Sequence, residues 1–199
     1  MYYVPPASNC LVGSSLFSIS QLQAMEQALQ SSATTYIIQR YDLTRPAPKE
    51  IISQVPGMYE RNTPRFVGEE EATAGVLERR KDTEAVQHLI ETGRSLIVAM
   101  LQDRMLGLVD CYPSNDGTHL NLSWILVEED YRRNGVAAAL HEEFEKMGEE
   151  MAIQVGVQID AVLLVHTENL CARRRYDAWG YKVMEEEGNK VRMVKSLLP

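Results

Sequence analysis

The chain has 199 residues, of which 45% are hydrophobic and 24% charged, and its formal net charge is -8. This composition is typical of a folded soluble protein, and the length suits one domain of ordinary size. The negative charge argues against general nucleic-acid binding, which needs a basic surface, and it is compatible with a cationic substrate. No apolar run approaches the roughly 20 residues of a membrane span, and segment 1–6 lacks the pattern of a secretory signal. The three cysteines form no disulfide or zinc pattern, so we expect a reduced, cytoplasmic protein with no bound metal. Together with the charge and the apolar runs, this leads us to expect no membrane partner and no nucleic-acid partner.

Residues 1–33 are expected to form an N-terminal extension. Segment 1–18 has a loop-like composition. The apolar residues that follow it recur at the spacing of one face of a short helix, namely Leu22, Met25 and Leu29. The rest of the chain, 34–199, is expected to form a single domain.

From residue 34 onward, segments with strand character and segments with helix character alternate. Pro56-Gly57 is expected to end a short helix and to begin an irregular loop that reaches Gly68. Asp82 is a suitable N-cap that divides a long helical segment, and Gly93 ends that segment. The predicted elements are a strand at 34–41, helices at 49–55 and 69–92, strands at 95–101, 106–112 and 120–127, a helix from Val136, a strand at 161–165, a helix at 169–179, and strands at 181–186 and 191–197. This order indicates one mixed α/β domain with a strand–helix–strand crossover in its second half.

The loop between the strand that ends at Val127 and the helix that follows carries a chemical pattern. A strand-to-helix turn exposes the unpaired N–H groups of the first helical turn, and these groups and the helix dipole attract an anion. Gly135 permits a close approach of the backbone, and Ala137 keeps the next position small. Arg132 and Arg133 add positive charge. From these residues alone, an anion site and a solvated surface turn are equally compatible with the pattern.

Two motifs together resemble those of the GNAT superfamily of N-acetyltransferases. Arg132-x-x-Gly135-x-Ala137 is similar to the family's motif A, whose backbone amides hold the pyrophosphate of coenzyme A. The later segment 169–181 is similar to motif B, with Tyr181 in place of the usual phenylalanine. Its residues that match in register are Asn169, Ala172, Tyr176 and Gly180. The sequence departs from the family pattern at two positions, with Arg175 where leucine is usual and Glu129 where proline is frequent.

The resemblance implies the fold and the cosubstrate. The implied fold is a mostly antiparallel, twisted central sheet flanked by helices, with a β-α-β crossover that carries the acetyl-CoA site. Acetyl-CoA is the implied cosubstrate, and no metal is implied. The implied coenzyme-binding residues are Leu126, Val127, Arg132, Arg133, Asn134, Gly135, Val136, Ala137, Asn169 and Tyr176.

The resemblance also implies a direct attack of an amine on the acetyl thioester. Backbone N–H groups near Leu126 or Val127 would stabilise the oxyanion, and Tyr176 would donate a proton to the departing thiolate. Glu128 is the candidate general base, and the competing interpretation is a solvent-exposed acid. Asn169 would bind the pantetheine arm, and it also suits a helix N-cap. Tyr176 also suits a plain core aromatic.

The leading functional prediction is acetyl transfer to an amine of a cationic small molecule. Segment 59–62 is expected to lie in a loop that roofs the acceptor site. The alternatives are a protein or peptide N-acetyltransferase and a non-catalytic coenzyme-A-binding regulatory module. The resemblance allows a homodimer, which no sequence feature demonstrates. His141-Glu142 opens like a zinc-protease helix but lacks the second histidine, so no zinc site is expected there.

Overall fold

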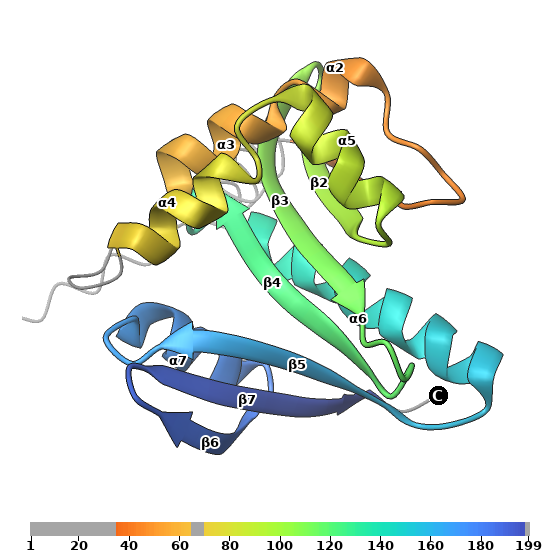
Figure 1. Cartoon of the computed structure of the whole chain (residues 1–199), viewed down its shortest axis with the longest axis vertical. Helices are drawn as coiled ribbons and strands as arrows, with labels where there is room; N and C mark the ends of the chain where they lie inside the picture. Colours follow the sequence, from red (N-terminus) through yellow and green to blue (C-terminus); the bar gives the residue numbers. More distant parts are fainter. Residues whose placement is uncertain (1–34, 65–69, 198–199) are drawn as a thin grey trace, which may run out of the picture. The chain divides into compact units, whose positions relative to one another are not determined.

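The computed structural model of the protein describes residues 35–64 and 70–197. The expected N-terminal extension, including the helix around Leu22, lies outside the described residues. Within them, one sheet contains seven strands in the order β1-β2-β3-β4-β5-β7-β6 (Figure 1). The strands are β1 (Ile37–Tyr41), β2 (Ser95–Leu101), β3 (Arg104–Pro113), β4 (His119–Val127), β5 (Ile159–His166), β6 (Lys182–Glu187) and β7 (Lys190–Leu197).

Among the described residues, four helices separate the first strand from the second, one connects the two parallel strands of the sheet, and one lies between β5 and β6. They are α2 (Lys49–Ile52), α3 (Val55–Asn62), α4 (Glu70–Glu78), α5 (Thr83–Glu91), α6 (Val136–Val155) and α7 (Leu170–Ala178), with a short 3₁₀ turn at Glu129–Tyr131. Strands β4 and β5 pair in parallel, and the other neighbouring strands pair antiparallel. The predicted mixed α/β fold with a mostly antiparallel sheet and a β4-α6-β5 crossover is therefore confirmed.

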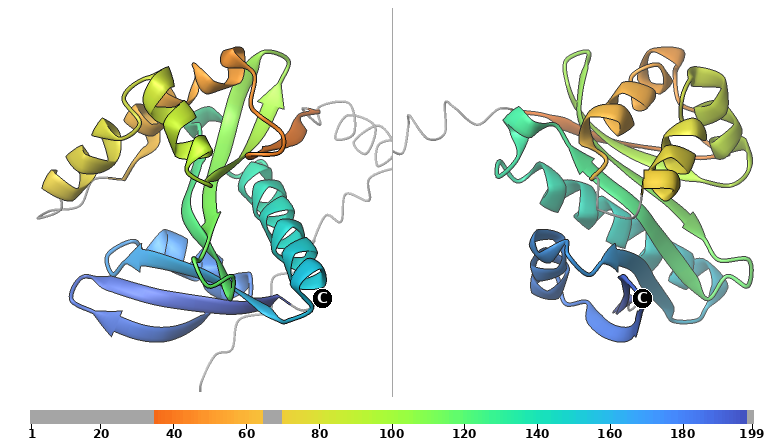
Figure 2. Two further views of the ribbon diagram at one scale, coloured as in Figure 1. Left: turned by 45° about the vertical axis from the view of Figure 1, so that its right-hand side comes forward. Right: turned by 60° about the vertical axis from the view of Figure 1, so that its left-hand side comes forward.

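The two faces of the sheet are covered by different helices. Figure 2 shows α6 on one face and the helices α2 to α5 on the other. Because successive side chains of a strand point to opposite faces, β2 contributes to both cores. Ile97 and Ala99 pack in the cluster with α6 and α7, whereas Leu96 and Val98 pack in the cluster with α2, α3 and α5.

Gly107 on β3 allows α6 to lie close to the sheet. A Cβ atom at this position would lie 2.8 Å from the carbonyl oxygen of Leu126 and 3.0 Å from a methyl group of Leu140. Contacts this short require the backbone or the helix to move, so a larger residue would displace α6. The close packing fixes the start of α6 beside the C-terminal end of β4.

The element predictions are confirmed in most places and wrong in one. Asp82 caps α5 by accepting a hydrogen bond from the N–H of Ala85 at 2.8 Å, and Gly93 follows that helix with a φ of +94°. Pro56, however, does not end a helix, because it lies in the first turn of α3. Proline is tolerated there because the N–H that it lacks would have no helical partner. The predicted irregular loop is thus helical through Asn62, and residues 65–69 of it lie outside the described residues.

Strand β4 changes its pairing at Ser123. Asp110 pairs with Trp124 and Cys111 pairs with Leu122, so Ser123 is the extra residue of a β-bulge. Strand β3 follows β4 as far as Val127, but β5 pairs with β4 only from His119 to Leu122. The two parallel strands then separate, as Figure 1 shows. Beyond Leu122, the edge of β4 that faces β5 has no strand partner, so its backbone N–H and C=O groups can bind a ligand.

Candidate active site

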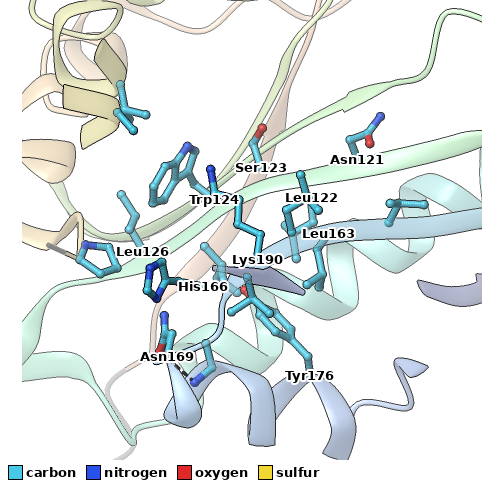
Figure 3. Close-up of a pocket in the computed structure, with 18 of the residues that line it drawn as sticks. Asn121, Leu122, Ser123, Trp124, Leu126, Leu163, His166, Asn169, Tyr176 and Lys190 are labelled. Carbon is cyan, nitrogen blue, oxygen red and sulfur yellow. Dashed lines mark hydrogen bonds between the residues drawn. The ribbon is translucent and has the colours of Figure 1, made fainter. Parts of the chain in front are cut away.

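A cavity of about 360 Å³ lies where β4 and β5 separate (Figure 3). Residues 121–126 of β4 and 162–166 of β5 form two of its walls. Helices α4 and α7, together with Pro64, Asn169, Tyr112 on β3 and Lys190 on β7, complete the lining. Three residues predicted from the sequence to act on the coenzyme meet in this cavity, namely Leu126, Asn169 and Tyr176.

Tyr176 lies on the buried side of α7 and lines the cavity. Its ring packs edge-on against the ring of Tyr181, with the two centroids 5.8 Å apart. Burial raises the pKa of the Tyr176 phenol above its ordinary value of 10.0. The hydroxyl therefore stays protonated at neutral pH and can act as a hydrogen-bond or proton donor.

Asn169 begins α7. Its Oδ1 accepts a hydrogen bond from the N–H of Ala172 at 3.2 Å, which confirms the N-cap interpretation. Asn169 and Ala172 both line the cavity, so the cap also fixes the amide side chain at the cavity wall. The binding of the pantetheine arm by Asn169 stays a prediction.

The loop before α6 has the backbone geometry of an anion site. Gly135 adopts a φ of +81° and Arg133 a φ of +66°, both in the left-handed region. The first helical hydrogen bond runs from the N–H of Ala139 to the carbonyl of Gly135 at 3.0 Å. The N–H groups of Val136 and Ala137 precede it and have no helical acceptor. Helix α6 has 20 residues and no acidic residue in its first turn, so the positive end of its dipole is not offset there.

Arg132 and Glu128 belong to one polar network at the end of β4. The guanidinium of Arg132 donates to the carbonyl of Val127 at 3.1 Å and to Oδ1 of Asn62 at 3.0 Å. The Nδ2 of Asn62 donates to Glu128 at 3.2 Å, and Nε of Arg61 donates to the same carboxylate at 3.1 Å. The network thus ties the last turn of α3 to the loop that leads to α6.

The structure does not bring Glu128 and Tyr176 to the same cavity. Glu128 lines a separate cavity of about 240 Å³ with Arg61 and Arg104. Burial raises the pKa of the Glu128 carboxyl, but the hydrogen bonds from Arg61 and Asn62 outweigh burial and leave the pKa below its ordinary value. A carboxylate held in this way is a weaker base, and its role as general base stays a prediction.

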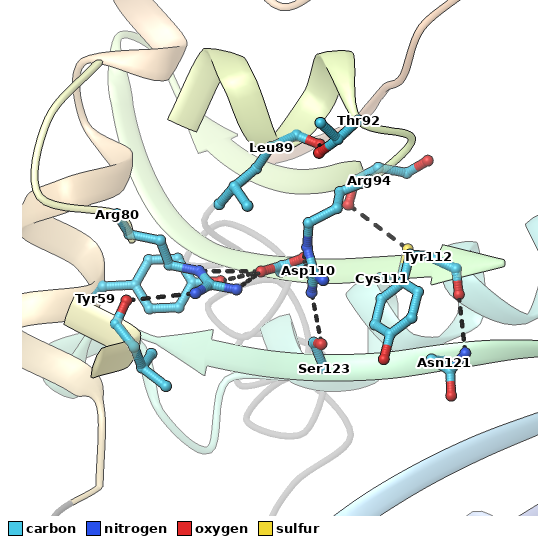
Figure 4. A network of polar contacts seen from close by, with 12 residues as sticks. Tyr59, Arg80, Leu89, Thr92, Arg94, Asp110, Cys111, Tyr112, Asn121 and Ser123 are labelled. Atoms are coloured by element: carbon cyan, nitrogen blue, oxygen red, sulfur yellow. Dashed lines mark hydrogen bonds and ion pairs between the residues drawn. The ribbon is translucent and has the colours of Figure 1, made fainter. Parts of the chain in front are cut away.

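A second polar network lies behind the β-bulge (Figure 4). The Asp110 side chain is 2% exposed and accepts hydrogen bonds at 2.6 Å from Tyr59, from Nη2 of Arg80 and from Nε of Arg94. Arg94 also donates to the hydroxyl of Ser123 at 2.6 Å. Tyr59, which the sequence placed in a roof loop, is therefore a buried residue of α3, and that expectation is wrong. Pro64 and α4 line the cavity instead.

Sequence reasoning missed several polar residues of the cavity. Ser123 and Asn121 interrupt an otherwise apolar strand, which is a visible signal, but the bulge that orients them is not visible in the sequence. His166 ends β5 and lines the cavity. Its Nδ1 accepts a hydrogen bond from the N–H of Glu168 at 3.2 Å, so the neutral ring carries its proton on Nε2. Lys190 comes from the β6–β7 hairpin, and no motif marks it.

Two further properties concern the described part of the chain. None of its helices is both long and apolar enough to cross a membrane. Residues 35–64 and 70–197 also contain no group of three or more His, Cys, Asp or Glu side chains that could hold a metal ion.

Comparison with known proteins agrees with this geometry. The model of the acetyltransferase (GNAT) family matches residues 56–181. Among solved structures, the PaiA N-acetyltransferase from Thermoplasma acidophilum in complex with coenzyme A is 16% identical, with a TM-score of 0.59 over 81% of this chain and 98% of that one. Ard1 from Thermoplasma volcanium is 19% identical, with a TM-score of 0.57 over 82% of this chain and 99% of that one. An aminoglycoside 6'-acetyltransferase of type Ii is 22% identical, with a TM-score of 0.57 over 82% and 98% of the two chains. No curated protein sequence matches the chain significantly.

Proposed function

The chain belongs to the acetyltransferase (GNAT) family, and from this premise we propose that it transfers the acetyl group of acetyl-CoA directly to an amine of a small molecule. Membership in the family makes it an acyltransferase that uses acetyl-CoA. The identity of the acceptor and the roles of individual residues are proposals. The observation that carries them is the cavity at the separation of β4 and β5, where Leu126, Asn169 and Tyr176 meet.

The coenzyme is proposed to bind along two adjacent features. The loop from Arg132 to Ala137 would hold the pyrophosphate, which the open amides at the start of α6 and the left-handed φ of Gly135 support. The pantetheine arm would lie along the free edge of β4, next to Asn169. The acetyl thioester would then lie in the cavity near Tyr176.

Besides the positioning of the amine, two groups of the chain have proposed roles in the transfer. The amine is held close to the thioester carbon, which supplies a large part of the rate. Backbone N–H groups near Leu126 or Val127 stabilise the oxyanion, since this edge of β4 has no strand partner. Tyr176 donates a proton to the departing thiolate, which its burial and raised pKa support.

Glu128 keeps two alternative roles. As a general base it would accept the proton of the amine through water. Its contacts with Arg61 and Asn62 support a positioning role instead, because they link its carboxylate to the side chain that holds Arg132. The variant Glu128→Gln, described in the Discussion, separates the two roles.

The size of the cavity supports a small acceptor. The cavity of about 360 Å³ would hold the acetyl thioester as well as the acceptor, and it lies near the lower end of the range of small-molecule sites, which is roughly 300 to 1,000 Å³. The amine arrives as an ammonium ion, and the net charge of -8 favours the approach of such a cation. A protein or peptide acceptor and a binding module without turnover are the competing proposals. The division into residues 1–33 and 34–199, a homodimer and a cytoplasmic location also stay predictions.

Two experiments in sequence test the proposed function. Calorimetry with acetyl-CoA tests coenzyme binding, and release of free thiol is then measured with a panel of small amines and with peptides. Turnover with small amines and none with peptides is the expected result. Coenzyme binding without thiol release on any acceptor would favour the binding module, and turnover with peptides alone would favour the protein acetyltransferase.

A further inference from the structure

The hydroxyl of Ser123 has a fixed position on the wall of the cavity. Ser123 is the extra residue of the bulge in β4, and it lines the cavity (Figure 3). Its Oγ accepts a hydrogen bond at 2.6 Å from Nη2 of Arg94 (Figure 4). The Nε of Arg94 donates to Asp110 at 2.6 Å, and its guanidinium lies 4.4 Å from the ring centre of Tyr112. These contacts fix the guanidinium, and the guanidinium fixes the serine oxygen.

The proton of this hydroxyl is available to a ligand. A serine hydroxyl has one proton to donate and two lone pairs that accept. Arg94 occupies one lone pair, and within residues 35–64 and 70–197 no other group forms a hydrogen bond with the Ser123 side chain. A hydrogen bond from a charged donor also polarises the hydroxyl that accepts it, which makes the proton of that hydroxyl a better donor. Ser123 is half-buried, so water can accept this proton before an acceptor binds.

An acceptor that displaces this water must replace it as the partner of the proton. The acceptor nitrogen cannot do so, because an ammonium group has no lone pair and a neutral amine needs its lone pair for the attack on the thioester. The chain neighbours of Ser123 that line the cavity offer no replacement, since Leu122 is apolar and the Trp124 indole has only an N–H donor. A donor that loses its water without a new partner weakens binding. An oxygen on the acceptor would supply that partner.

Building on the proposed function, we infer that Ser123 selects an acceptor that carries a hydrogen-bond-accepting oxygen near its reacting amine, as an amino alcohol does. The serine proton is donated to this oxygen, and the amine lone pair stays free for the thioester. The apolar side chains of Val76, Trp124 and Leu126 also line the cavity and suit the carbon skeleton of such an acceptor. An amine without the oxygen leaves the serine proton unpaired, and a site built around such a hydrogen bond discriminates against the analogue that lacks it.

Matched acceptors test this inference on the wild-type protein. Thiol release from acetyl-CoA is measured with 2-phenylethylamine beside 2-amino-1-phenylethanol, and with butylamine beside 1-amino-2-butanol and 4-amino-2-butanol. We expect kcat/KM to be at least about 10-fold higher for at least one amino alcohol than for its parent amine. A smaller preference in every pair would overturn the inference but leave the acetyltransferase standing. Thiol release with none of these acceptors would overturn the inference and count against the proposed small-molecule function.

The variant Ser123→Ala assigns the preference to one hydroxyl. It should raise KM for the preferred amino alcohol about 10-fold, toward the KM of the parent amine, because one hydrogen bond to the acceptor is lost. Thr73→Val is the matched control and should retain the wild-type preference, because Thr73 on α4 lines the same cavity and this change also removes one hydroxyl. Thermal unfolding confirms that both variants fold.

Two outcomes of the variant experiment contradict the inference. An unchanged preference in Ser123→Ala would show that another group recognises the oxygen. Equal losses with amino alcohols and parent amines would show that the hydroxyl acts on a group common to all the reactions, such as the thioester. Either result would overturn the role of Ser123 in acceptor selection.

Discussion

On the face of the sheet covered by α2 to α5, the Asp110 side chain is 2% exposed and has two arginine partners. On the face covered by α6 and α7, the His141 side chain is 3% exposed, and burial lowers its pKa to about 4. Its ring stacks on Trp179 with centroids 4.0 Å apart, and its Nε2 lies 3.1 Å from the hydroxyl of Tyr181. The face covered by α2 to α5 thus buries ionised side chains that pair with one another. The face covered by α6 and α7 buries a titratable histidine that stays neutral at pH 7.

The difference follows from the partners that each face provides. A buried carboxylate stays ionised only where nearby cations and donors replace water, as Arg80, Arg94 and Tyr59 do for Asp110. His141 has aromatic neighbours, and the positive charge of Lys195 also disfavours its protonation. The paired network lies behind the β-bulge at Ser123, which lines the cavity, whereas α7 on the other face carries Tyr176. Variants of the two faces should therefore differ in their effects on stability and on catalysis.

The largest effect is expected for Asp110→Asn. The substitution removes the negative charge and leaves the buried Arg80 and the partly buried Arg94 without a counter-ion, which should lower the free energy of unfolding by about 3 to 5 kcal/mol. Urea denaturation followed by circular dichroism measures this change. Asp103→Asn in the exposed β2–β3 turn is the control and should change stability by less than about 0.5 kcal/mol. A small loss for Asp110→Asn would show that the network is not a buried charge cluster.

The next effect is the pH dependence that His141 imposes. Its pKa rises from about 4 in the folded protein to about 6.5 in the unfolded chain, so the unfolded state binds the additional proton. Above about pH 6.5 the ring is neutral in both states, so its titration does not lower stability. As the pH drops from there toward 4, the free energy of unfolding should fall by about 3 kcal/mol. Denaturation of the wild type and of His141→Gln at several pH values isolates this part of the slope. The exposed His88→Gln should retain the wild-type slope, and an unchanged slope in His141→Gln would contradict the neutral buried histidine.

Tyr176→Phe should lower kcat about 100-fold, because the departing thiolate loses its proton donor. The dissociation constant of coenzyme A should change little, since the ring and its packing remain. Steady-state thiol release and calorimetry measure the two quantities. Tyr112→Phe removes a hydroxyl from the same cavity and should retain most of the activity. Full activity of Tyr176→Phe would show that the tyrosine is only a core aromatic.

The smallest effect is expected for Glu128→Gln. The Arg61 side chain of this pair is 59% exposed, and such pairs contribute about 0.2 to 1 kcal/mol. The positioning role predicts a few-fold weaker binding of coenzyme A and little change in kcat, measured by calorimetry and thiol release. Glu129→Gln serves as the neighbouring control. A loss of about 100-fold in kcat at unchanged coenzyme affinity would instead assign the general base to Glu128.

Local patterns predicted the elements well because the physical causes are local. Asp82 and Gly93 delimit α5 through caps that depend on a few residues. The motif before α6 likewise depends on a strand, a turn and a glycine that are close together in the chain. Pro56 is ambiguous in the sequence, because a proline can end one helix and also suits the first turn of another.

The polar networks beside the cavity could not be predicted, because their residues are far apart in the sequence and meet only in the folded chain. Asp110 lies on β3, whereas Arg80 and Arg94 lie in the connections that follow α4 and α5, and no periodicity links the three residues. The bulge at Ser123 is a matter of register between β3 and β4, which a single strand does not encode. The side-chain direction of Glu128 depends on Arg61 in α3, a segment that the sequence suggested was an irregular loop.

The central claim is that the first turn of α6 holds the pyrophosphate of acetyl-CoA, and titration calorimetry of Ala137→Asp tests it most directly. A carboxylate in the first turn of a helix is favourable for the helix itself but repels a bound anion. We therefore predict an unchanged thermal midpoint and an increase of at least about 10-fold in the dissociation constant of coenzyme A, equivalent to about 1.4 kcal/mol. Ala74→Asp, at an exposed position of α4, should bind as the wild type does. Wild-type affinity in a folded Ala137→Asp would contradict the claim.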